Sequence, residues 1–236
     1  MRIDELAAGI SDHGFAIWHG FLDDPRLADL RSAAAHLLTG EHGNPYPKST
    51  RAWDLHLHGS PFIEVLMDPR LSDLLNILLR DRHLLSDFSL NQVLPGQPVD
   101  DWHIDYPYNE MPTLVTGSIL GLQCVLALDR FDEVNGATQL LRGTHSAPRR
   151  PAEPFGMPVS FEAEPGTLLV MAAATWHRSG LNRSSDPRTA MLMSFVEGWI
   201  KPMSAPTDGL AQPLPERLAR LLGLDAVVET INGVRI

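Results

Sequence analysis

The chain has 236 residues, with 19 basic and 29 acidic side chains and a formal net charge of −10. This charge argues against a nucleic-acid binder and against attachment to anionic lipid headgroups. Hydrophobic residues make up 44% of the chain and charged residues 20%, which is typical of a globular protein. The single cysteine, Cys124, excludes an internal disulfide and a thiolate metal cluster.

The N-terminal sequence MRIDELAAGISDHG has no basic region followed by an apolar stretch, so we expect no signal peptide. No stretch approaches the roughly 18 uninterrupted apolar residues of a membrane span. We therefore expect a cytoplasmic protein that binds a small molecule, with no membrane, nucleic-acid or protein partner. At this length one large core is the simplest arrangement, so we expect one domain over residues 1–236.

Residues 1–82 are expected to form a helical front section. Apolar residues recur there at helical spacing, and Asp23-Asp-Pro25 is a typical helix-start signal. The predicted elements are, in order, a helix containing Leu6 and Ile10, a strand at 15–18, a helix from 24 to 39, a loop at 41–49, and helices beginning near 61 and 69.

Beyond residue 83 the sequence changes to short segments rich in β-forming residues, separated by Pro, Gly and Asn. Several such strands after a helical section predict helices packed on a β-sandwich or jelly roll. The predicted strands of this core, residues 83–200, lie at 84–94, 118–128, 136–141, 167–171 and 188–200. A last amphipathic helix is expected at 213–224.

Three residues have the types and spacing of a metal site. His103 and Asp105 are two positions apart, so on a strand both side chains face the same side. His177 follows 72 residues later, after the apolar strand 167–171. Two histidines and one carboxylate can hold one face of a divalent metal and leave other positions open, as in non-haem Fe(II) oxygenases. Taken alone, His177 could simply end a strand.

Arg188 lies 11 residues beyond His177, at the start of a predicted strand. A guanidinium inside a β-barrel can pair with a carboxylate through two hydrogen bonds. The distal carboxylate of 2-oxoglutarate, whose other end would chelate the metal, is such a partner. A surface ion pair with Asp186 is the alternative for Arg188 alone, but the order and spacing of the four residues favour the buried site.

With these motifs the sequence resembles the phytanoyl-CoA dioxygenase family of Fe(II)- and 2-oxoglutarate-dependent oxygenases. The matching segments cover most of the chain: Ser11-Asp-His-Gly-Phe, Leu94-Pro-Gly-Gln, Trp102-His-Ile-Asp, Val134-Asn-Gly-Ala-Thr, Arg142-Gly-Thr-His and Trp176-His-Arg-Ser-Gly. The resemblance implies a double-stranded β-helix (jelly roll, cupin-like), mainly β with α, with N-terminal helices packed on the outer sheet.

The resemblance also implies the roles of individual residues. The metal positions correspond to His103, Asp105 and His177, which would also be the catalytic centre, and the co-substrate arginine corresponds to Arg188. Ser179, Gln123 and Gln92 match positions that reach the co-substrate, although a polar side chain satisfied within the sheet is the alternative for each. The implied cofactors are Fe(II), the co-substrate 2-oxoglutarate, and O2.

The substrate contacts are expected ahead of the core and just after the metal motif. On a strand, His56 and His58 in Asp54-Leu-His-Leu-His58 would share one face and could bind a second metal, but no third ligand follows at suitable spacing, so we assign them to the substrate wall. Tyr106, just after the metal motif, could line the same substrate opening. Alternatively, the acidic and aromatic residues of this loop could form a solvated rim. The full predicted set of substrate residues is His56, His58, Tyr108, Asn109, Glu110 and Trp199.

These residues predict an oxygenase that hydroxylates or oxidatively cyclises a polar small molecule or a sugar-containing natural product, releasing succinate and CO2. A bacterial antibiotic-biosynthesis enzyme, such as an orthosomycin-type oxidative cyclase, fits this expectation. Two alternatives stay open: a non-redox metal- or 2-oxoglutarate-binding jelly-roll module, and a zinc hydrolase with the same three ligands. The intact ligand set and Arg188 argue against the first, and no evident general base supports the second.

Overall fold

The computed structural model describes residues 2–46, 49–96, 101–147, 149, 151–152, 157–204, 214–224, 230–231 and 234–235. Its helices are α1 (Ile3–His13), α2 (Asp24–Thr39), α3 (Ser60–Leu66), α4 (Pro69–Leu79) and α5 (Glu216–Leu221). Its strands are β1 (Phe15–Trp18), β2 (Asn44–Tyr46), β3 (Ser49–Ala52), β4 (Leu84–Val93), β5 (Gly121–Ala127), β6 (Thr138–Leu140), β7 (Val159–Ser160), β8 (Leu168–Ala172), β9 (His177–Ser179), β10 (Arg188–Val196), β11 (Thr230–Ile231) and β12 (Val234–Arg235). Three 3₁₀ turns are η1 (Leu55–Leu57), η2 (Tyr108–Glu110) and η3 (Thr144–Ser146).

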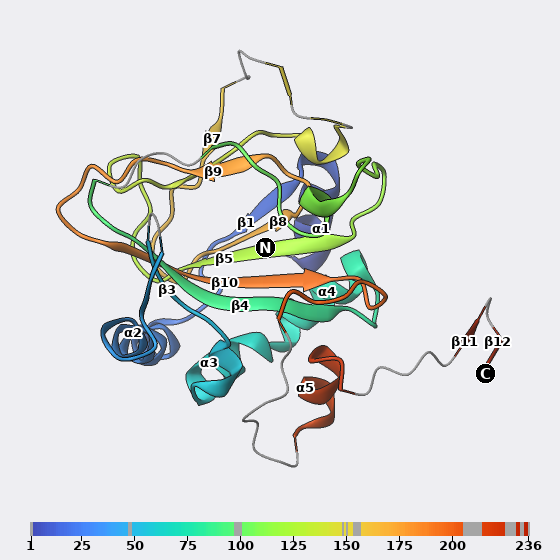
Figure 1. Ribbon diagram of the computed structural model, residues 1–236, viewed down its shortest axis with the longest axis horizontal. Helices are drawn as coiled ribbons and strands as arrows, with labels where there is room; N and C mark the ends of the chain where they lie inside the picture. The colour runs from blue at the N-terminus through green and yellow to red at the C-terminus, as the bar shows by residue number, and fades with distance from the viewer. Residues whose placement is uncertain are drawn as a thin grey trace.

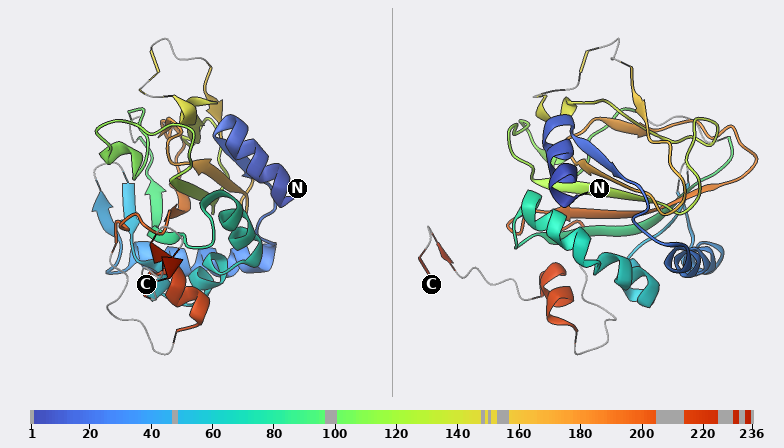
Figure 2. Two further views of the ribbon diagram at one scale, coloured as in Figure 1. Left: turned by 90° about the vertical axis from the view of Figure 1, so that its right-hand side faces the viewer. Right: turned by 180° about the vertical axis from the view of Figure 1, so that it is seen from behind.

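Two antiparallel sheets face each other. The larger has seven strands in the order β1-β8-β5-β10-β4-β3-β2, and the smaller has the order β7-β6-β9. From β7 to β10 the chain alternates between the two sheets, and β10 enters the large sheet between β4 and β5, so several neighbours within a sheet are distant in sequence. Figure 1 shows the small sheet on one side of the large sheet and helices on the other, and Figure 2 shows this layering from two further directions. The predicted double-stranded β-helix with helices on its outer sheet is confirmed.

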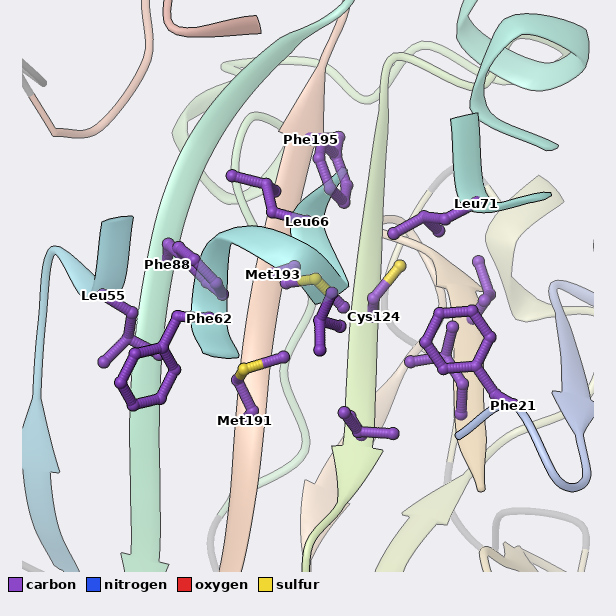
Figure 3. Packing of buried hydrophobic residues seen from close by; sticks show 14 of the residues in the cluster. Phe21, Leu55, Phe62, Leu66, Leu71, Phe88, Cys124, Met191, Met193 and Phe195 are labelled. Atoms are coloured by element: carbon purple, nitrogen blue, oxygen red, sulfur yellow. The ribbon is translucent and has the colours of Figure 1, made fainter. Parts of the chain in front are cut away.

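The two-residue alternation of β-strands separates the outer core from the interior of the jelly roll. On β10, Met191, Met193 and Phe195 point outward, where they pack with the apolar faces of the helices. Figure 3 shows these side chains beside Phe62 and Leu71 from the helices. The intervening residues of β10 point toward the small sheet, so the same strand contributes to the core with one face and to an internal cavity with the other.

Local signals place the helices where the sequence predicted them. The side chain of Asp23 caps α2 by accepting a hydrogen bond from the backbone N–H of Arg26, at 3.1 Å. The apolar stripe of α2, from Leu27 to Leu38, packs into the outer core. No helix in the described part of the chain is long and apolar enough to cross a membrane.

Two local predictions were wrong. The expected loop at 41–49 contains β2 and the first residue of β3. Its residues have weak β-propensity, but the hydrogen bonds of β2 to β3 and of β3 to β4 stabilise the extended backbone.

The segment from Asp54 to His58 forms the turn η1 rather than a strand. Its two histidines therefore do not share a strand face.

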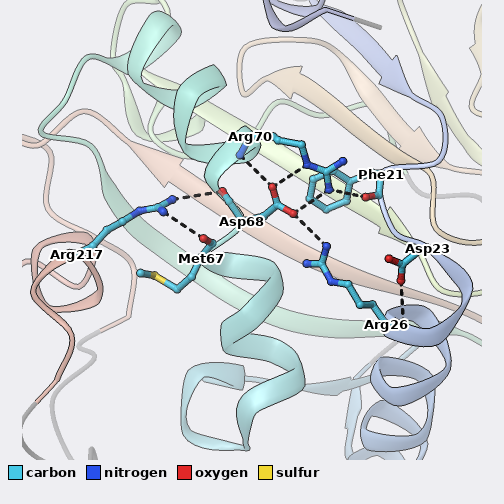
Figure 4. Close-up of polar contacts among 7 residues, drawn as sticks. All are labelled: Phe21, Asp23, Arg26, Met67, Asp68, Arg70 and Arg217. Carbon is cyan, nitrogen blue, oxygen red and sulfur yellow. Dashed lines mark hydrogen bonds and ion pairs between the residues drawn. The ribbon is translucent and has the colours of Figure 1, made fainter.

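Asp68 joins three segments of the helical layer. Its carboxylate is 3% exposed and accepts hydrogen bonds from Arg70 at 2.8 and 3.0 Å and from Arg26 at 3.2 Å (Figure 4). Arg70 also donates to the carbonyl of Phe21, and Arg217 of α5 donates to the carbonyls of Met67 and Asp68. Burial alone would raise the pKa of Asp68, but the hydrogen bonds and charge of Arg70 hold it below its ordinary value.

We expect Asp68→Asn to lower the free energy of unfolding by about 1–3 kcal/mol at neutral pH, the cost of charge-assisted hydrogen bonds whose arginines can rehydrate. Because the pKa of Asp68 is lowered in the folded state, its stabilisation is complete above the ordinary value of 3.8 and is lost as the pH falls through the folded-state value. Urea unfolding of both proteins at neutral and acid pH measures this. The exposed Asp73→Asn on α4 is the control, and an unchanged difference at acid pH would contradict the assignment.

Cys124 lies on the outer face of β5 and is fully buried among the apolar residues of Figure 3. Burial raises the pKa of its thiol, so the reactive thiolate is suppressed.

We expect Cys124 not to react with an aromatic disulfide reagent in the folded protein, and we expect one thiol per chain to react in guanidinium. Rapid labelling of the native protein would show that this part of the core opens readily.

Candidate active site

A cavity of about 310 Å³ lies between the two sheets. The inward residues of β10, namely Arg188, Ala190, Leu192 and Ser194, run along one of its walls. The strands on either side and the small sheet supply the other lining residues: Asp87, Asn91, Gln123, Val125, Thr138, Met171, His177 and Ser179. Residues from β3 and from the loops complete it: Arg51, Trp53, His103, Asp105, Tyr106, Asn109 and Met203.

Backbone pairing brings His103 and His177 together. The N–H of each residue donates to the carbonyl of the other, both at 3.0 Å, and the N–H of Asp105 donates to the carbonyl of Ala173 at 2.8 Å. The imidazole rings lie 4.3 Å apart between centroids. Ligand atoms of His103, Asp105 and His177 all lie within 4.8 Å of one another, so residues 72 positions apart form one compact group.

Hydrogen bonds to backbone carbonyls fix the tautomer of both histidines. Nδ1 of His103 lies 2.9 Å from the carbonyl of Asp101, and Nδ1 of His177 lies 2.9 Å from the carbonyl of Thr175. Because a carbonyl oxygen only accepts, each Nδ1 carries the hydrogen in the neutral ring. Each Nε2 is then left with a lone pair directed toward Asp105, which is the orientation found in metal-binding histidines.

This arrangement fits a divalent cation. Nε2 of His177 lies 3.5 Å from Oδ2 of Asp105, and Nε2 of His103 lies 3.9 Å from Oδ1. Oδ2 is buried and accepts no hydrogen bond from the described residues. The lone pairs of Nε2 of the buried His177 and of Oδ2 repel each other unless a cation lies between them. Two imidazole nitrogens and a carboxylate are a donor set that suits Fe(II) and leaves other coordination positions open.

Arg188 lies inside the jelly roll. It is 2% exposed, which argues against the surface ion pair with Asp186. Its guanidinium lies 4.2 Å from the centroid of the Phe131 ring and donates to the carbonyl of Gly136 at 2.9 Å. Gly136 has φ 78°, and a Cβ there would lie 2.6 Å from the carbonyl oxygen of Gly180. The turn therefore needs glycine, and it holds Arg188 in the cavity wall.

The other predicted co-substrate residues are divided between the cavity and the sheet. Ser179 and Gln123 line the cavity, and Oε1 of Gln123 is buried without a hydrogen-bond partner among the described residues. Gln92 follows Asn91 on β4 and faces the opposite side of the sheet, where its amide donates to Oγ1 of Thr189 at 3.3 Å. The structure thus brings together six of the seven predicted metal and co-substrate residues.

The predicted substrate residues are more scattered. Asn109 lines the cavity, as does Tyr106. Tyr108 is 2% exposed, and its hydroxyl donates to the carbonyl of Ser118 and accepts from the N–H of Leu120. The remaining four lie outside the cavity lining formed by the described residues: His56 is buried on η1, His58 contacts the ring of His42, and Glu110 and Trp199 are exposed.

Sequence reasoning missed eleven residues of the cavity lining, and the polar or aromatic ones among them are Arg51, Trp53, Asp87, Asn91, Thr138 and Ser194. A signal for Asp87 and Asn91 was present, because Asp87, Ser89 and Asn91 alternate with the apolar Phe88 and Leu90. At the spacing of a strand they share one face, and a buried strand places polar residues on one face only where they have a use. Burial raises the pKa of Asp87, and a hydrogen bond from Ser89 and the charge of Arg51 act against this.

An antiparallel double-stranded β-helix with two histidines and a carboxylate in its cavity defines the class of non-haem iron oxygenases. The sequence profile of the phytanoyl-CoA dioxygenase family matches residues 10–190. The chain belongs to this family and is a 2-oxoglutarate-dependent dioxygenase that uses Fe(II), 2-oxoglutarate and O2.

Relatives and solved structures agree with this class. Dioxygenase af480 of Aspergillus fumigatus is 28% identical, with 99% of this chain and 81% of the relative covered. Multifunctional dioxygenase ausE of Penicillium brasilianum is 25% identical, with 98% and 85% covered. The crystal structure of the epimerase SnoN from nogalamycin biosynthesis matches with a TM-score of 0.72 and 19% identity, covering 83% of this chain and 80% of SnoN. The last comparison supports the fold.

We expect His177→Ala and Asp105→Ala to weaken Fe(II) binding by more than about 100-fold, since changes in outer-shell residues alone typically cost 10- to 100-fold. Anaerobic calorimetry with Fe(II) measures the affinity. The exposed His19→Ala is a matched control that should bind normally. Equal affinity in all four proteins would place the metal elsewhere.

Proposed function

We propose that His103, Asp105 and His177 hold Fe(II) and that Arg188 binds the distal carboxylate of 2-oxoglutarate. The observation that carries this proposal is the group of opposed acceptor atoms, with Nε2 of His177 at 3.5 Å from the buried Oδ2 of Asp105. When bound, iron and 2-oxoglutarate react with O2 to supply an oxidant that attacks a C–H bond, with succinate and CO2 as co-products.

The residues of the chain would bind and orient the co-substrate and shield the site from water. Arg188 supplies a guanidinium whose position is set by Phe131 and the carbonyl of Gly136, so it can accept the carboxylate with little rearrangement. Ser179, two residues beyond His177 on β9, and Gln123 on β5 line the same cavity and can donate further hydrogen bonds. The apolar residues Val125, Met171 and Leu192 exclude water from this part of the cavity.

We further propose a polar small molecule as the substrate, hydroxylated or oxidatively cyclised as part of natural-product biosynthesis. The cavity walls not assigned to the metal or co-substrate include Arg51, Asp87 and Asn109, which favour a polar ligand. SnoN, solved with Fe3+, alpha ketoglutarate and nogalamycin RO, and the carbocyclase SnoK, at a TM-score of 0.69 and 13% identity over 84% of this chain and 86% of SnoK, support this class by likeness of fold. A glycosylated substrate fits the same walls.

An anaerobic titration tests the co-substrate site. Wild-type protein with Fe(II) should develop the weak visible charge-transfer band of the 2-oxoglutarate chelate. Arg188→Met keeps the packing on Phe131 and removes the charge, so we expect it to need about 10- to 100-fold more 2-oxoglutarate, the loss from a charge-assisted hydrogen-bonded pair.

Arg188→Lys should fall between the two, because a single ammonium cannot reproduce the planar guanidinium. Formation of succinate after O2 is admitted separates an oxygenase from a module that only binds. A chelate band with no succinate would favour the binding module, and wild-type protein that binds iron without a band would overturn the assignment.

A further inference from the structure

A row of polar side chains crosses the inner face of the large sheet at the end away from Arg188. In the strand register Ser194 of β10 lies opposite Gln123 of β5 on one side and Asp87 of β4 on the other. All three line the cavity. A strand rises roughly 3.3 Å per residue, so the six-residue step from Arg188 to Ser194 separates this row from Arg188 by roughly 20 Å.

This distance places Asp87 beyond the part of the cavity that the distal end of a five-carbon diacid on Arg188 would occupy. The N–H of Asp105 donates to the carbonyl of Ala173, whose own N–H donates to the carbonyl of Gly121 at the end of β5 that carries Gln123. The row that contains Asp87 therefore lies at the same end of the large sheet as the proposed iron ligands. Asp87 is not one of the three grouped ligand residues. Asp87 therefore faces the space in which a substrate would approach the metal.

Two polar side chains on the same inner face as Asp87 carry acceptors without a donor in the described part of the chain. Ser89 donates to Oδ2 of Asp87 at 2.7 Å. Oδ1 of Asn91 and Oε1 of Gln123 are buried and lack a hydrogen-bond partner among the described residues. A buried acceptor without a donor is unfavourable, so this face favours a ligand that brings donors.

The charge balance of the cavity favours a ligand without net charge. Arg51 and Arg188 balance Asp87 and Asp105. Fe(II) and the dianion of 2-oxoglutarate balance each other in the proposed complex. An ammonium or carboxylate on the substrate would add an uncompensated charge to a partly buried space, which is unfavourable. Hydroxyl groups supply donors without adding charge.

We propose that Asp87 is a specificity-determining residue that accepts a hydrogen bond from a hydroxyl group of a neutral, polyhydroxylated substrate, such as a sugar ring. The proposal rests on the proposed function and names the substrate class of the same site. Gln123, on the other side of Ser194, and Asn91, four residues along β4 on the same face, can accept further hydroxyl hydrogen bonds. Arg51, on the neighbouring strand, can donate to a hydroxyl or ether oxygen of the same ligand.

The test uses three sets of methyl glycosides: neutral, cationic 2-amino-2-deoxy and anionic uronic. Each is added to the anaerobic complex of wild-type protein, Fe(II) and 2-oxoglutarate, and the shift of the chelate band and the later formation of succinate are recorded. We expect the neutral set to act at the lowest concentration. Asp87→Asn should weaken that response by about 10- to 100-fold, and the exposed Asp73→Asn should leave it unchanged.

Monodeoxy versions of the best neutral glycoside test the same contact without a variant, and one of them should lose the response in wild-type protein. A chelate band with no response to any neutral glycoside would overturn this inference and leave the oxygenase assignment intact. A stronger response to the amino sugars, or an unchanged response in Asp87→Asn, would overturn it as well. Absence of the chelate band in wild-type protein would instead remove the proposed function on which it rests.

Discussion

The pairing of β10 with a neighbour on each edge is the constraint on which the rest of the molecule depends. Register with β4 and β5 fixes which residues of β10 face outward and which face inward. A shift of the register by one residue would place Ala190 and Leu192 on the outer face instead of Met191 and Met193. It would also turn the side chain of Arg188 out of the cavity. The outer core therefore stabilises the site indirectly, because the burial of its methionines and Phe195 selects the register that points the polar residues inward.

The metal group depends on a different kind of constraint. His103 is a single bridge residue and not part of a long strand, and its reciprocal backbone hydrogen bonds with His177 hold the segment from His103 to Asp105 to the small sheet. The backbone also orients both imidazoles through their Nδ1 atoms. Main-chain groups thus do the positioning that side chains perform in many metal sites, and no side-chain substitution removes these carbonyls.

Sequence patterns predicted the jelly roll and the residues grouped at the metal because both follow from local rules. The spacing of His103 and Asp105 places them on one face, and apolar runs such as 167–171 mark buried strands. Long-range pairing was not predictable in the same way. Residues 44–46 form a strand by pairing with β3, which pairs with β4, and His56 is buried on η1, which contacts β4. The alternation of polar residues around Asp87 indicated a polar strand face, but the sequence does not show which residues lie across the sheet from it, so its place in the cavity was not predictable.

The packing of Arg188 affects how tightly the site can bind a dianion. An exposed arginine loses about 2 kcal/mol of rotamer entropy when a ligand orders it. Arg188 is already ordered against Phe131 and the carbonyl of Gly136, so that entropy is lost during folding and not again on binding. The turn at residues 135–136 therefore raises the affinity for the dianion without contacting it, because it holds Arg188 in its binding conformation before the dianion binds.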